Sequence, residues 1–326
     1  MKFLFYGFRH YHIYDLFHQV QQNPDMEILA AIEEHEPTRT DCEKNLNFKF
    51  DDGTYEQWLE NPEVEAVAIG GAFGDRGQAI IKALQHGKHV ISDKPICTRL
   101  EELEQIRALA REKHLQVHGM LDLKYSSAVL RFKELLESGK YGEVRNVSFT
   151  GQHYLNYGNR PGWYYEEDRQ GGTINDISIH GIDMLHYIAG LTVAKVNAAR
   201  TWNCYAYNHP NFNDCAIFMA ELNNKAGLLV DVSYAAPSQV FTMPTYWNFK
   251  FWCDRGLITF TSGGNSVTVY ADGATEPEVF PGIAPERNML DVFVDAIATG
   301  SNEITENDLF TAESTLRIQQ VADAAL

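Results

Sequence analysis

The sequence predicts an α/β protein in which a doubly wound parallel sheet is followed by an α/β domain with an open, mainly antiparallel sheet. Short apolar runs alternate with amphipathic helical segments in the first part, as in a parallel sheet. Longer alternating segments follow, as in antiparallel strands. Because 326 residues exceed one typical core, we expect two domains, residues 1–121 and 122–326.

In the first domain, apolar runs that end at turn residues alternate with amphipathic segments. Residues 2–6 predict the first strand, and the segment after Gly7 predicts a helix with one apolar side, formed by Ile13, Leu16, Phe17 and Val20. Further strands are expected at 27–32, 64–69, 89–92 and 115–120. Further helices are expected at 55–59, 78–85 and 100–113.

The second domain begins with a helix, expected at 126–138 and closed by Gly139. Strands of one larger sheet are then expected at 144–154, 193–201, 215–222, 227–234, 248–254, 256–261 and 266–270. Two helices are expected to close the domain, at 289–298 and 309–325.

Composition excludes several classes of partner. The net charge is −17 and no basic stripe is visible, so we expect no nucleic-acid partner. No apolar run approaches about 20 residues, and the apolar start is too short for a signal peptide, so we expect no membrane partner. Five cysteines at wide spacings suit a reducing cytoplasm better than a disulfide scaffold.

A candidate dinucleotide site lies at the carboxyl ends of the predicted parallel strands, beginning with the first turn. The usual fingerprint has glycine at its first, third and sixth places. In Gly7-Phe8-Arg9-His10-Tyr11-His12 only the first glycine is present. The side chains at the other two places can hinder close approach of a pyrophosphate, although Arg9 can also contribute a positive charge to it.

Two later segments favour the same site. Glu33 follows the second strand about 20 residues after the turn, where a carboxylate can hold a ribose 2′-hydroxyl and repel a 2′-phosphate. It therefore favours NAD over NADP. The glycine-rich run 70–74 lets the backbone pass close to a flat ligand. The plainer alternatives, a solvated acidic turn and a tight turn, stay open.

The histidines also allow a metal-site interpretation. His10-Tyr11-His12 is similar to the His-x-His of metal-dependent barrel hydrolases, and His180, Asp183 and His186 could ligate a metal from one helix. Such a barrel needs about eight strand–helix units, which the second half does not supply. We therefore expect no metal, and we expect His186 to be a packed helix residue.

The run 171–183 is the most informative segment of the chain. Asp176 and His180 stand four residues apart in what reads as the start of a helix, so both side chains lie on one face, one turn apart. A carboxylate beside an imidazole can orient the ring and raise its basicity, which is what a general base needs. A buried pair with a structural role is the open alternative.

Three motifs in order resemble a known family. Residues 87–95 (GKHVISDKP) are similar to the "GKHV…EKP" signature of the Gfo/Idh/MocA family of glucose–fructose oxidoreductase and inositol dehydrogenase. Residues 135–144 (LLESGKYGEV) resemble its "L..SG..GEV" segment, and residues 171–183 resemble its "GGG.L.D.G.H..D" motif. The helix around 293–297 also looks like the closing helix of the family, so the resemblance runs nearly end to end.

The resemblance implies a Rossmann domain followed by an α/β domain with an open, mainly antiparallel sheet. It implies NAD(P)-dependent oxidation or reduction of sugars, cyclitols or related polyols. By position, Lys94 would lie near the nicotinamide and the reacting hydroxyl, Asp176 would orient substrate and base, and His180 would be the base. Asp183 would be a substrate contact or a structural partner.

The chain departs from the family pattern on the cofactor side. Asp93 replaces the usual glutamate, side chains replace two fingerprint glycines, and the loop after the third strand lacks the usual Thr-Pro…His pattern. The expected cofactor contacts are therefore named with the departures included: Gly7, Phe8, Arg9, His10, Glu33, Gly70, Gly71, Ala72, Asp93 and Lys94.

Aromatic residues are dense just before the Asp…His motif, and sugar faces stack on such rings. Trp163 and Tyr164 are the expected substrate contacts there, and a loop that merely packs against the sheet is the alternative. The remaining expected substrate contacts are Lys94, Asp176, His180 and Asp183.

The expected reaction is hydride transfer between a carbinol and a nicotinamide. The chief rival is a non-catalytic sugar-responsive member that lost the dinucleotide site. A third possibility is glycoside hydrolysis through transient oxidation by tightly held NAD. Because a broad antiparallel sheet often pairs with itself, we expect a homodimer or homotetramer.

Overall fold

The computed structural model describes residues 1–237 and 246–325. Its contacts divide the chain into two compact units. Unit 1 is formed by Met1–Met120, Pro161–Gly171 and Met289–Ala312. Unit 2 is formed by Leu121–Arg160, Gly172–Asn288 and Glu313–Leu326. The backbone thus passes from one unit to the other five times, once at each boundary between these segments.

The sheet of unit 1 has five parallel strands in the order β2-β1-β3-β4-β5. Its strands are β1 (Lys2–Phe8), β2 (Glu27–Ile32), β3 (Ala66–Gly70), β4 (His89–Ser92) and β5 (Val117–Gly119). The side chains of β3 are buried on both faces, as expected for a parallel sheet covered by helices on both sides. The predicted doubly wound sheet is confirmed.

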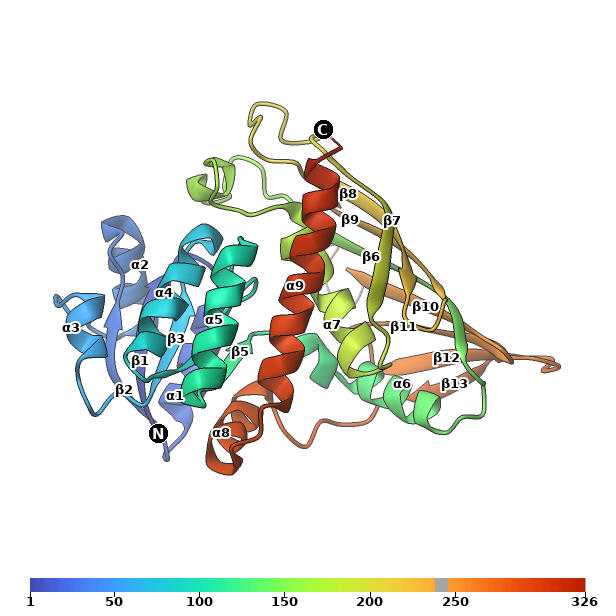
Figure 1. The fold of residues 1–326 in the computed structure, drawn as a ribbon, viewed down its shortest axis with the longest axis horizontal. Helices are drawn as coiled ribbons and strands as arrows, with labels where there is room; N and C mark the ends of the chain where they lie inside the picture. The colour runs from blue at the N-terminus through green and yellow to red at the C-terminus, as the bar shows by residue number, and fades with distance from the viewer. Residues whose placement is uncertain (238–245, 326) are drawn as a thin grey trace. The chain divides into compact units, whose positions relative to one another are not determined.

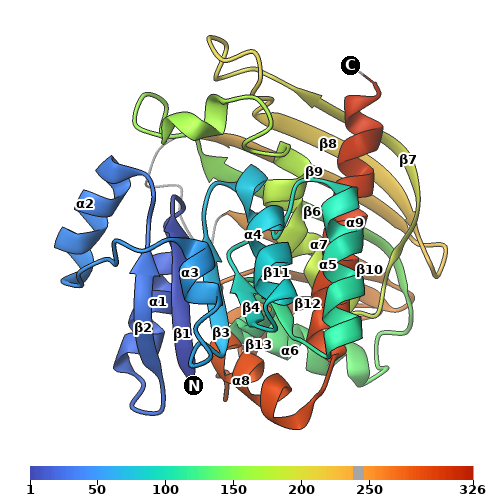
Figure 2. The ribbon, with the colours of Figure 1, turned by 60° about the vertical axis from the view of Figure 1, so that its left-hand side comes forward.

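Helices cover both faces of this sheet (Figures 1 and 2). They are α1 (His12–Gln22), α2 (Glu36–Leu46), α3 (Tyr55–Leu59), α4 (Phe73–Gln85), α5 (Leu100–Lys113) and α8 (Met289–Thr299). Crossovers between parallel strands are right-handed. Helix α1 leads from β1 to β2, and α4 leads from β3 to β4, which is the opposite direction across the sheet. The two helices therefore lie on opposite faces.

The helices of unit 1 differ from expectation at two places. All four apolar residues predicted to line α1 are buried. Helix α2 was not predicted, because only Cys42 and Leu46 of its eleven residues are buried and no apolar stripe marks it. Helix α4 begins at Phe73, five residues before the predicted start, so part of the glycine-rich run is the first turn of a helix.

The sheet of unit 2 has eight strands in the order β13-β12-β11-β10-β6-β9-β8-β7. Its strands are β6 (Val144–Tyr154), β7 (Val193–Trp202), β8 (Cys215–Leu222), β9 (Gly227–Ala236), β10 (Trp247–Cys253), β11 (Gly256–Thr261), β12 (Ser266–Ala271) and β13 (Glu278–Pro281). Only β6 and β9 pair in parallel, so the prediction of a mainly antiparallel sheet is confirmed. The short edge strand β13 was not predicted.

One face of the larger sheet is covered by α6 (Ser127–Glu137) and α7 (Ile179–Tyr187), which lie along it in Figure 1. A Cβ atom at Gly181 of α7 would come within 2.4 Å of the Phe149 ring of β6, so glycine permits this close packing. The other face exposes large apolar side chains of this chain: Ile217, Met219, Leu229, Trp252 and Tyr270.

The long helix α9 (Glu303–Asp323) begins in unit 1 and ends in unit 2. In unit 1 its first turns complete the edge of the parallel sheet. The backbone N–H of Val117 in β5 donates to Thr305 Oγ1 at 3.1 Å, and that of Gly119 donates to Asp308 Oδ2 at 2.9 Å. Side chains of α9 thus satisfy edge donors that would otherwise lack a strand partner.

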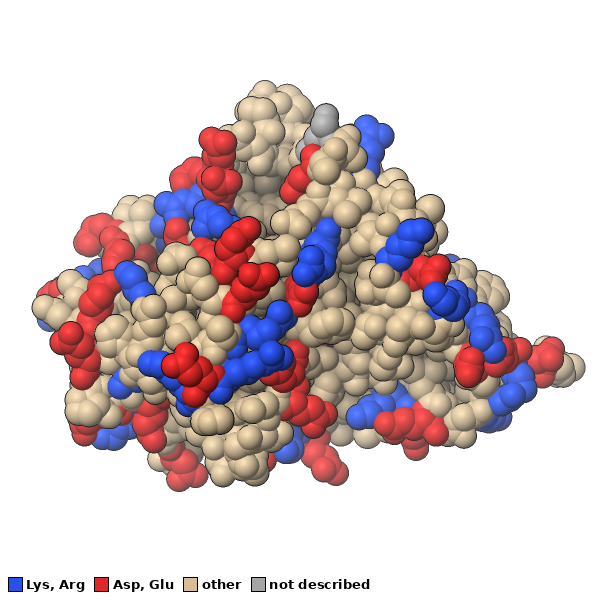
Figure 3. Space-filling model, in the orientation of Figure 1, with Lys and Arg blue, Asp and Glu red and all other residues tan. Residues whose placement is uncertain are grey.

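Two surface properties complete the description. Among the described helices, none is both long enough and apolar enough to cross a membrane. Acidic and basic side chains are interspersed over the face drawn in Figure 3.

Candidate active site

The first turn of unit 1 is held close to the end of β3. Gly7 has φ +76°, and a Cβ atom there would lie 2.7 Å from the backbone nitrogen of Gly71, so only glycine fits. The backbone N–H groups of Arg9 and His10 donate to the carbonyl of Gly70 at 3.0 and 3.2 Å. A Cβ atom at Gly71, in contrast, would meet no atom within 4 Å, so the backbone there is open to a neighbouring group.

Glu33 lies against this turn, at the carboxyl end of β2. It is 5% exposed, and its Oε2 accepts from the backbone N–H of Phe8 at 2.5 Å, while Oε1 accepts from that of His35 at 2.8 Å. A carboxylate offers about four acceptor positions, so two remain for another donor such as a ribose hydroxyl. Glu33 is therefore placed by the turn rather than being a solvated acidic residue.

Asp93, which follows β4, is the centre of a buried cluster. Its Oδ2 lies 2.5 Å from Nδ1 of His10, its Oδ1 lies 3.0 Å from Nδ1 of His12, and the guanidinium of Arg76 donates to Oδ2 at 3.2 Å. Burial opposes ionisation, but His10, Arg76 and His12 outweigh it and hold the pKa of the Asp93 carboxyl well below its usual range. Two side chains of the glycine-poor turn thus bind the end of β4.

The same cluster has the spacing of a metal site, since ligand atoms of His10, His12 and Asp93 lie within 4.8 Å of one another. The guanidinium of Arg76 already shares the carboxylate, and its positive charge disfavours a divalent cation beside it. Burial lowers the pKa of His10 to about 4, so this imidazole is neutral near pH 7. The arrangement is sufficient to tie the first turn to β4 without an ion.

Arg76 also fixes the backbone that carries Lys94. It donates to the carbonyl of Lys94 at 2.5 Å, to that of Pro95 at 3.2 Å and to that of Gly71 at 2.9 Å. The bond between Lys94 and Pro95 is cis. Lys94 is 2% exposed, so it is not the surface lysine that a strand end usually carries. Sequence reasoning missed Arg76, whose one signal was a positive charge two residues after the glycine-rich run.

The aromatic segment before the Asp…His motif belongs to unit 1. The indole N–H of Trp163 donates to the carbonyl of Arg9 at 3.3 Å, and its ring stacks on Tyr164 with centroids 4.0 Å apart. Both rings pack on Phe73, the first residue of α4. The structure therefore shows the packing role that the sequence left open, and substrate contact by these two rings stays a prediction.

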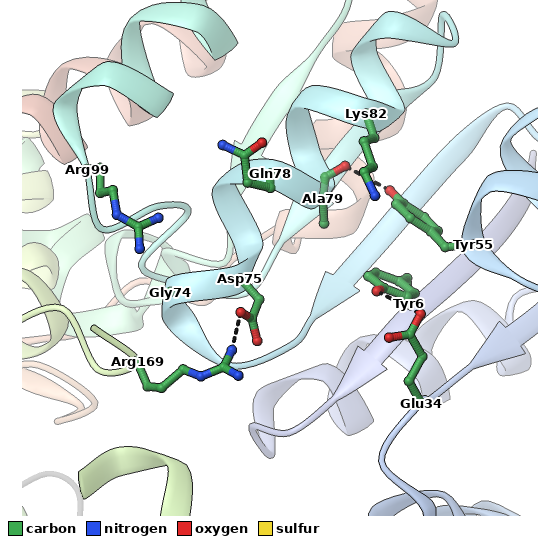
Figure 4. A pocket seen from close by; sticks show the side chains of 10 residues that line it. All are labelled: Tyr6, Glu34, Tyr55, Gly74, Asp75, Gln78, Ala79, Lys82, Arg99 and Arg169. Atoms are coloured by element: carbon green, nitrogen blue, oxygen red, sulfur yellow. Dashed lines mark hydrogen bonds and ion pairs between the residues drawn. The ribbon is translucent and has the colours of Figure 1, made fainter. Parts of the chain in front are cut away.

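A cavity of about 480 Å³ opens in unit 1 beside the end of β2 (Figure 4). It is lined by Tyr6, Glu34, Tyr55, Gly74, Asp75, Gln78, Ala79, Lys82, Arg99 and Arg169. Figure 4 shows the Arg169 side chain directed at Asp75, with which it forms an ion pair. The Tyr6 ring stacks on Tyr55 with centroids 3.9 Å apart, so the cavity combines aromatic and charged walls.

In unit 2, Asp176 lies in a π-helical turn, Ile174–Ser178, that leads directly into α7. The sequence predicted the start of an ordinary α-helix. The structure has a π-helical turn there instead, with more residues per turn than an α-helix. The turn is held by the side-chain amide of Gln319, whose Oε1 accepts from the N–H of Ile174 at 3.0 Å. Asp176 and His180 are 3% and 5% exposed. Such turns are frequent at functional sites.

Two strands supply the neighbours of these side chains. The phenol of Tyr234 in β9 donates to Oδ2 of Asp176. The ring of Trp247 in β10 meets that of His180 edge to face, with centroids 5.4 Å apart. Neither aromatic residue was singled out from the sequence, because their approach depends on the pairing of distant strands.

Asp183 and His186, farther along α7, sit around one buried lysine. Nζ of Lys124 lies 3.1 Å from Oδ1 of Asp183, and both side chains are almost fully buried. Burial and then the charge of Lys124 lower the pKa of His186 to about 3. His186 is thus a packed neutral residue, as predicted. Asp183 was expected to be either a substrate contact or a structural partner, and Lys124 is a side chain with which it forms an ion pair.

The structure brings the predicted residues together in two sets. Unit 1 gathers the cofactor-side residues with Lys94, Trp163 and Tyr164, and unit 2 gathers Asp176, His180 and Asp183. That the two sets form one active site remains a prediction.

Two family models match this chain, and each matches a different part of it. Residues 5–120 match a family model described as "oxidoreductase family, NAD-binding Rossmann fold". Residues 129–259 match one described as "GFO/IDH/MocA C-terminal domain". The two models carry the same family name and together cover most of the chain.

A curated relative is levoglucosan dehydrogenase from Pseudarthrobacter phenanthrenivorans, 25% identical over 186 residues. The alignment covers 55% of this chain and 47% of that enzyme, so the chain matches about half of the length of this relative.

Solved structures share the fold over nearly the whole chain. A levoglucosan dehydrogenase in complex with NADH and levoglucosan superposes with a TM-score of 0.82 at 17% identity, covering 100% of this chain and 98% of that one. A 3-ketoreductase from Actinomadura kijaniata in complex with NADP and TDP-benzene gives 0.80 at 17% identity, covering 99% and 97%. At identities this low, the structural likeness shows a common fold and nothing more.

Proposed function

Because the chain is a member of the Gfo/Idh/MocA family of NAD-binding oxidoreductases, we propose that it transfers a hydride between NAD and a carbinol carbon of a sugar, cyclitol or related polyol. The observation that carries the proposal is the burial of both Asp176, on the π turn that leads into α7, and His180, on α7 itself. A pure binding protein needs no proton acceptor there. Relatives named for levoglucosan and D-xylose support a sugar-like substrate.

The proposed roles follow from the chemistry of the side chains. In the oxidative direction His180 takes the hydroxyl proton as the hydride leaves the carbinol carbon, a task suited to imidazole because its ordinary pKa is about 6.5. The ammonium of Lys94 stabilises negative charge that develops on the oxygen. Asp176 orients the base and the substrate.

The residues of unit 1 fit a dinucleotide. The N–H-rich start of α1 and the open backbone at Gly71 suit a pyrophosphate, and the free acceptor positions of Glu33 suit ribose hydroxyls. When bound, NAD supplies the nicotinamide that accepts or returns the hydride. We propose NAD rather than NADP, because a 2′-phosphate would meet the carboxylates of Glu33 and Glu34.

The charged, aromatic cavity beside Glu34 is the proposed place for the adenosine end of the cofactor. It begins where β2 ends, next to Glu33, and its stacked rings of Tyr6 and Tyr55 give it one apolar wall.

Calorimetric titration with NADH and NADPH tests the proposal. We expect micromolar binding of NADH and much weaker binding of NADPH, and we expect Glu33→Gln to weaken NADH at least about tenfold, because a charge-assisted bond to the ribose is lost. Glu27→Gln is the matched control, since it removes the same charge from the exposed start of β2, away from the first turn and from the cavity.

Absence of binding by either nucleotide, in folded protein free of carried-over cofactor, would contradict the proposal and favour the non-catalytic alternative. If NADH binds, a polyol screen follows, and release of a free sugar from a glycoside would identify the hydrolytic alternative.

We also propose that the protein works in the cytoplasm as a homodimer or homotetramer that acts on small molecules. The open face of the larger sheet carries Trp252 on β10, which is 48% exposed, and exposed aliphatic side chains on β9 and β8. A charged side chain introduced into such an interface would lose its water on association, at a high cost in free energy. Trp252→Glu is therefore expected to give a monomer in light scattering, whereas Tyr207→Glu, on an exposed loop, leaves the oligomer intact. An unchanged oligomer in the first variant would rule out this face.

A further inference from the structure

Tyr234 occupies a position that the proposed roles do not yet use. It lies on β9, is 2% exposed, and donates its phenolic hydrogen to Oδ2 of Asp176, which is itself buried. A hydrogen bond from a hydroxyl to a carboxylate is among the stronger bonds in proteins because the acceptor is charged. Asp176, which is proposed to orient His180, is therefore held by the Tyr234 hydroxyl from a strand far away in the sequence.

The Tyr234 ring is fixed from several sides. Its backbone N–H donates to the carbonyl of Asp214 at 2.8 Å, and its ring packs against Phe212 with centroids 5.2 Å apart. The guanidinium carbon of Arg160 lies 4.7 Å from the ring centroid. Arg160 is anchored in turn, because it donates to the carbonyls of Leu155 and Tyr154, both at 2.6 Å. A ring held this way presents its hydroxyl in one direction.

The cation above the ring also affects the phenol. A positive charge at the face of an aromatic ring is attracted by the ring and draws electron density away from the hydroxyl hydrogen. The phenol of Tyr234 is therefore a better hydrogen-bond donor to Asp176 than an isolated tyrosine would be. The bond from Tyr234 also limits the orientations that the Asp176 carboxylate can take.

We infer that Tyr234 is a positioning residue for the proposed reaction, acting through Asp176 on the proton transfer by His180. The inference rests on the proposed function, because it assigns Tyr234 a part in that step. The hydrogen bond from Tyr234 neutralises part of the negative charge of the Asp176 carboxylate. The carboxylate then stabilises a proton on the His180 imidazole less strongly. Tyr234 thereby keeps His180 unprotonated, and ready to accept a proton, down to a lower pH.

Other charged or titratable groups surround these three side chains. They are His153 on β6, Arg160 after β6, Asp214 before β8, Lys124 in the short helix before α6, and Asp183 and His186 on α7 itself. Tyr234→Phe keeps all of these groups and removes the phenolic oxygen that donates to Asp176.

The test is Tyr234→Phe in the full chain, with Tyr207→Phe as the matched control. Tyr207 is 74% exposed and lies on the loop between β7 and β8. We expect Tyr234→Phe to lower kcat about 10- to 100-fold, with KM changed less than about threefold, because a hydrogen bond to a charged group is lost. We also expect the acidic limb of the kcat profile to move to higher pH.

A second measurement needs no substrate. NMR titration of ¹⁵N-labelled imidazoles gives the midpoint of His180 in the native protein and in Tyr234→Phe, after melting curves have shown that both are folded. We expect a higher midpoint in the variant, since the carboxylate then acts more fully on the imidazolium. Identical midpoints, or a kcat loss that is uniform across pH, would overturn the inference.

The two measurements also separate this inference from the proposed function. If His180→Ala keeps full turnover while the His180 midpoint still moves in Tyr234→Phe, the proposed role of His180 fails and the coupling through Asp176 stands. If turnover depends on His180 and the midpoint does not move, the role of Tyr234 alone is wrong.

Discussion

Replacing His180 with alanine is expected to lower turnover about a hundredfold or more, because a positioned general base contributes two to four orders of magnitude. The side chain is buried on α7 against Trp247, and alanine supplies no group there that can accept a proton. Affinity for NADH is expected to stay within a factor of about two, since the residues that fit the dinucleotide lie in unit 1. Steady-state kinetics and calorimetry on the same preparation measure both quantities.

His18→Ala is the control for this variant. His18 is exposed on α1 and lies outside every residue set discussed above, so its loss should leave kcat unchanged. Turnover by His180→Ala at the native rate would remove His180 from the role of base. A loss of turnover together with a loss of NADH affinity would instead indicate a damaged fold.

The largest expected effect on stability comes from Lys124→Met. Removing one partner of a buried ion pair leaves the other charge buried and uncompensated, which costs about 3–5 kcal/mol. Both Lys124 and Asp183 are almost fully buried, and the ammonium also lies 5.0 Å from the centroid of the Tyr187 ring. Urea unfolding should therefore show a markedly lower free energy of unfolding for the variant.

Two comparisons interpret that loss. The double variant Lys124→Met with Asp183→Leu should recover much of the stability, because no buried charge is then left alone. Lys225→Met, which breaks the exposed pair with Glu221, should cost less than about 1 kcal/mol. A Lys124→Met protein as stable as Lys225→Met would show that Asp183 has no structural need of its partner, and would return Asp183 to the substrate contacts.

The sequence predicts the fold well where burial is periodic. Helix α1 and the strands of both sheets follow their apolar patterns, and the family resemblance is confirmed by models that match both halves. Helix α2 escaped prediction because it buries only two side chains at one end, and β13 because a four-residue edge strand buries little. In both cases tertiary contacts, rather than local pattern, decide the structure.

The candidate site was less accessible to sequence reasoning. The residue types on the catalytic side were visible from spacing, but the partners of Asp176 and His180 come from β9 and β10, which only the sheet brings near. On the cofactor side, His12 stands where the fingerprint has glycine, and His10 lies in the same turn. The structure gives them a function, since both bind Asp93, the aspartate that replaces the glutamate of the family motif.

The contacts between β5 and α9 have a consequence for how the chain is made. Synthesis proceeds from the amino terminus, and early domains usually fold while the ribosome is still working. Here the edge N–H groups of Val117 and Gly119 find their acceptors only at Thr305 and Asp308. A nascent chain must therefore grow by almost two hundred further residues before these two N–H groups reach their acceptors, and until then the edge of its first sheet lacks them.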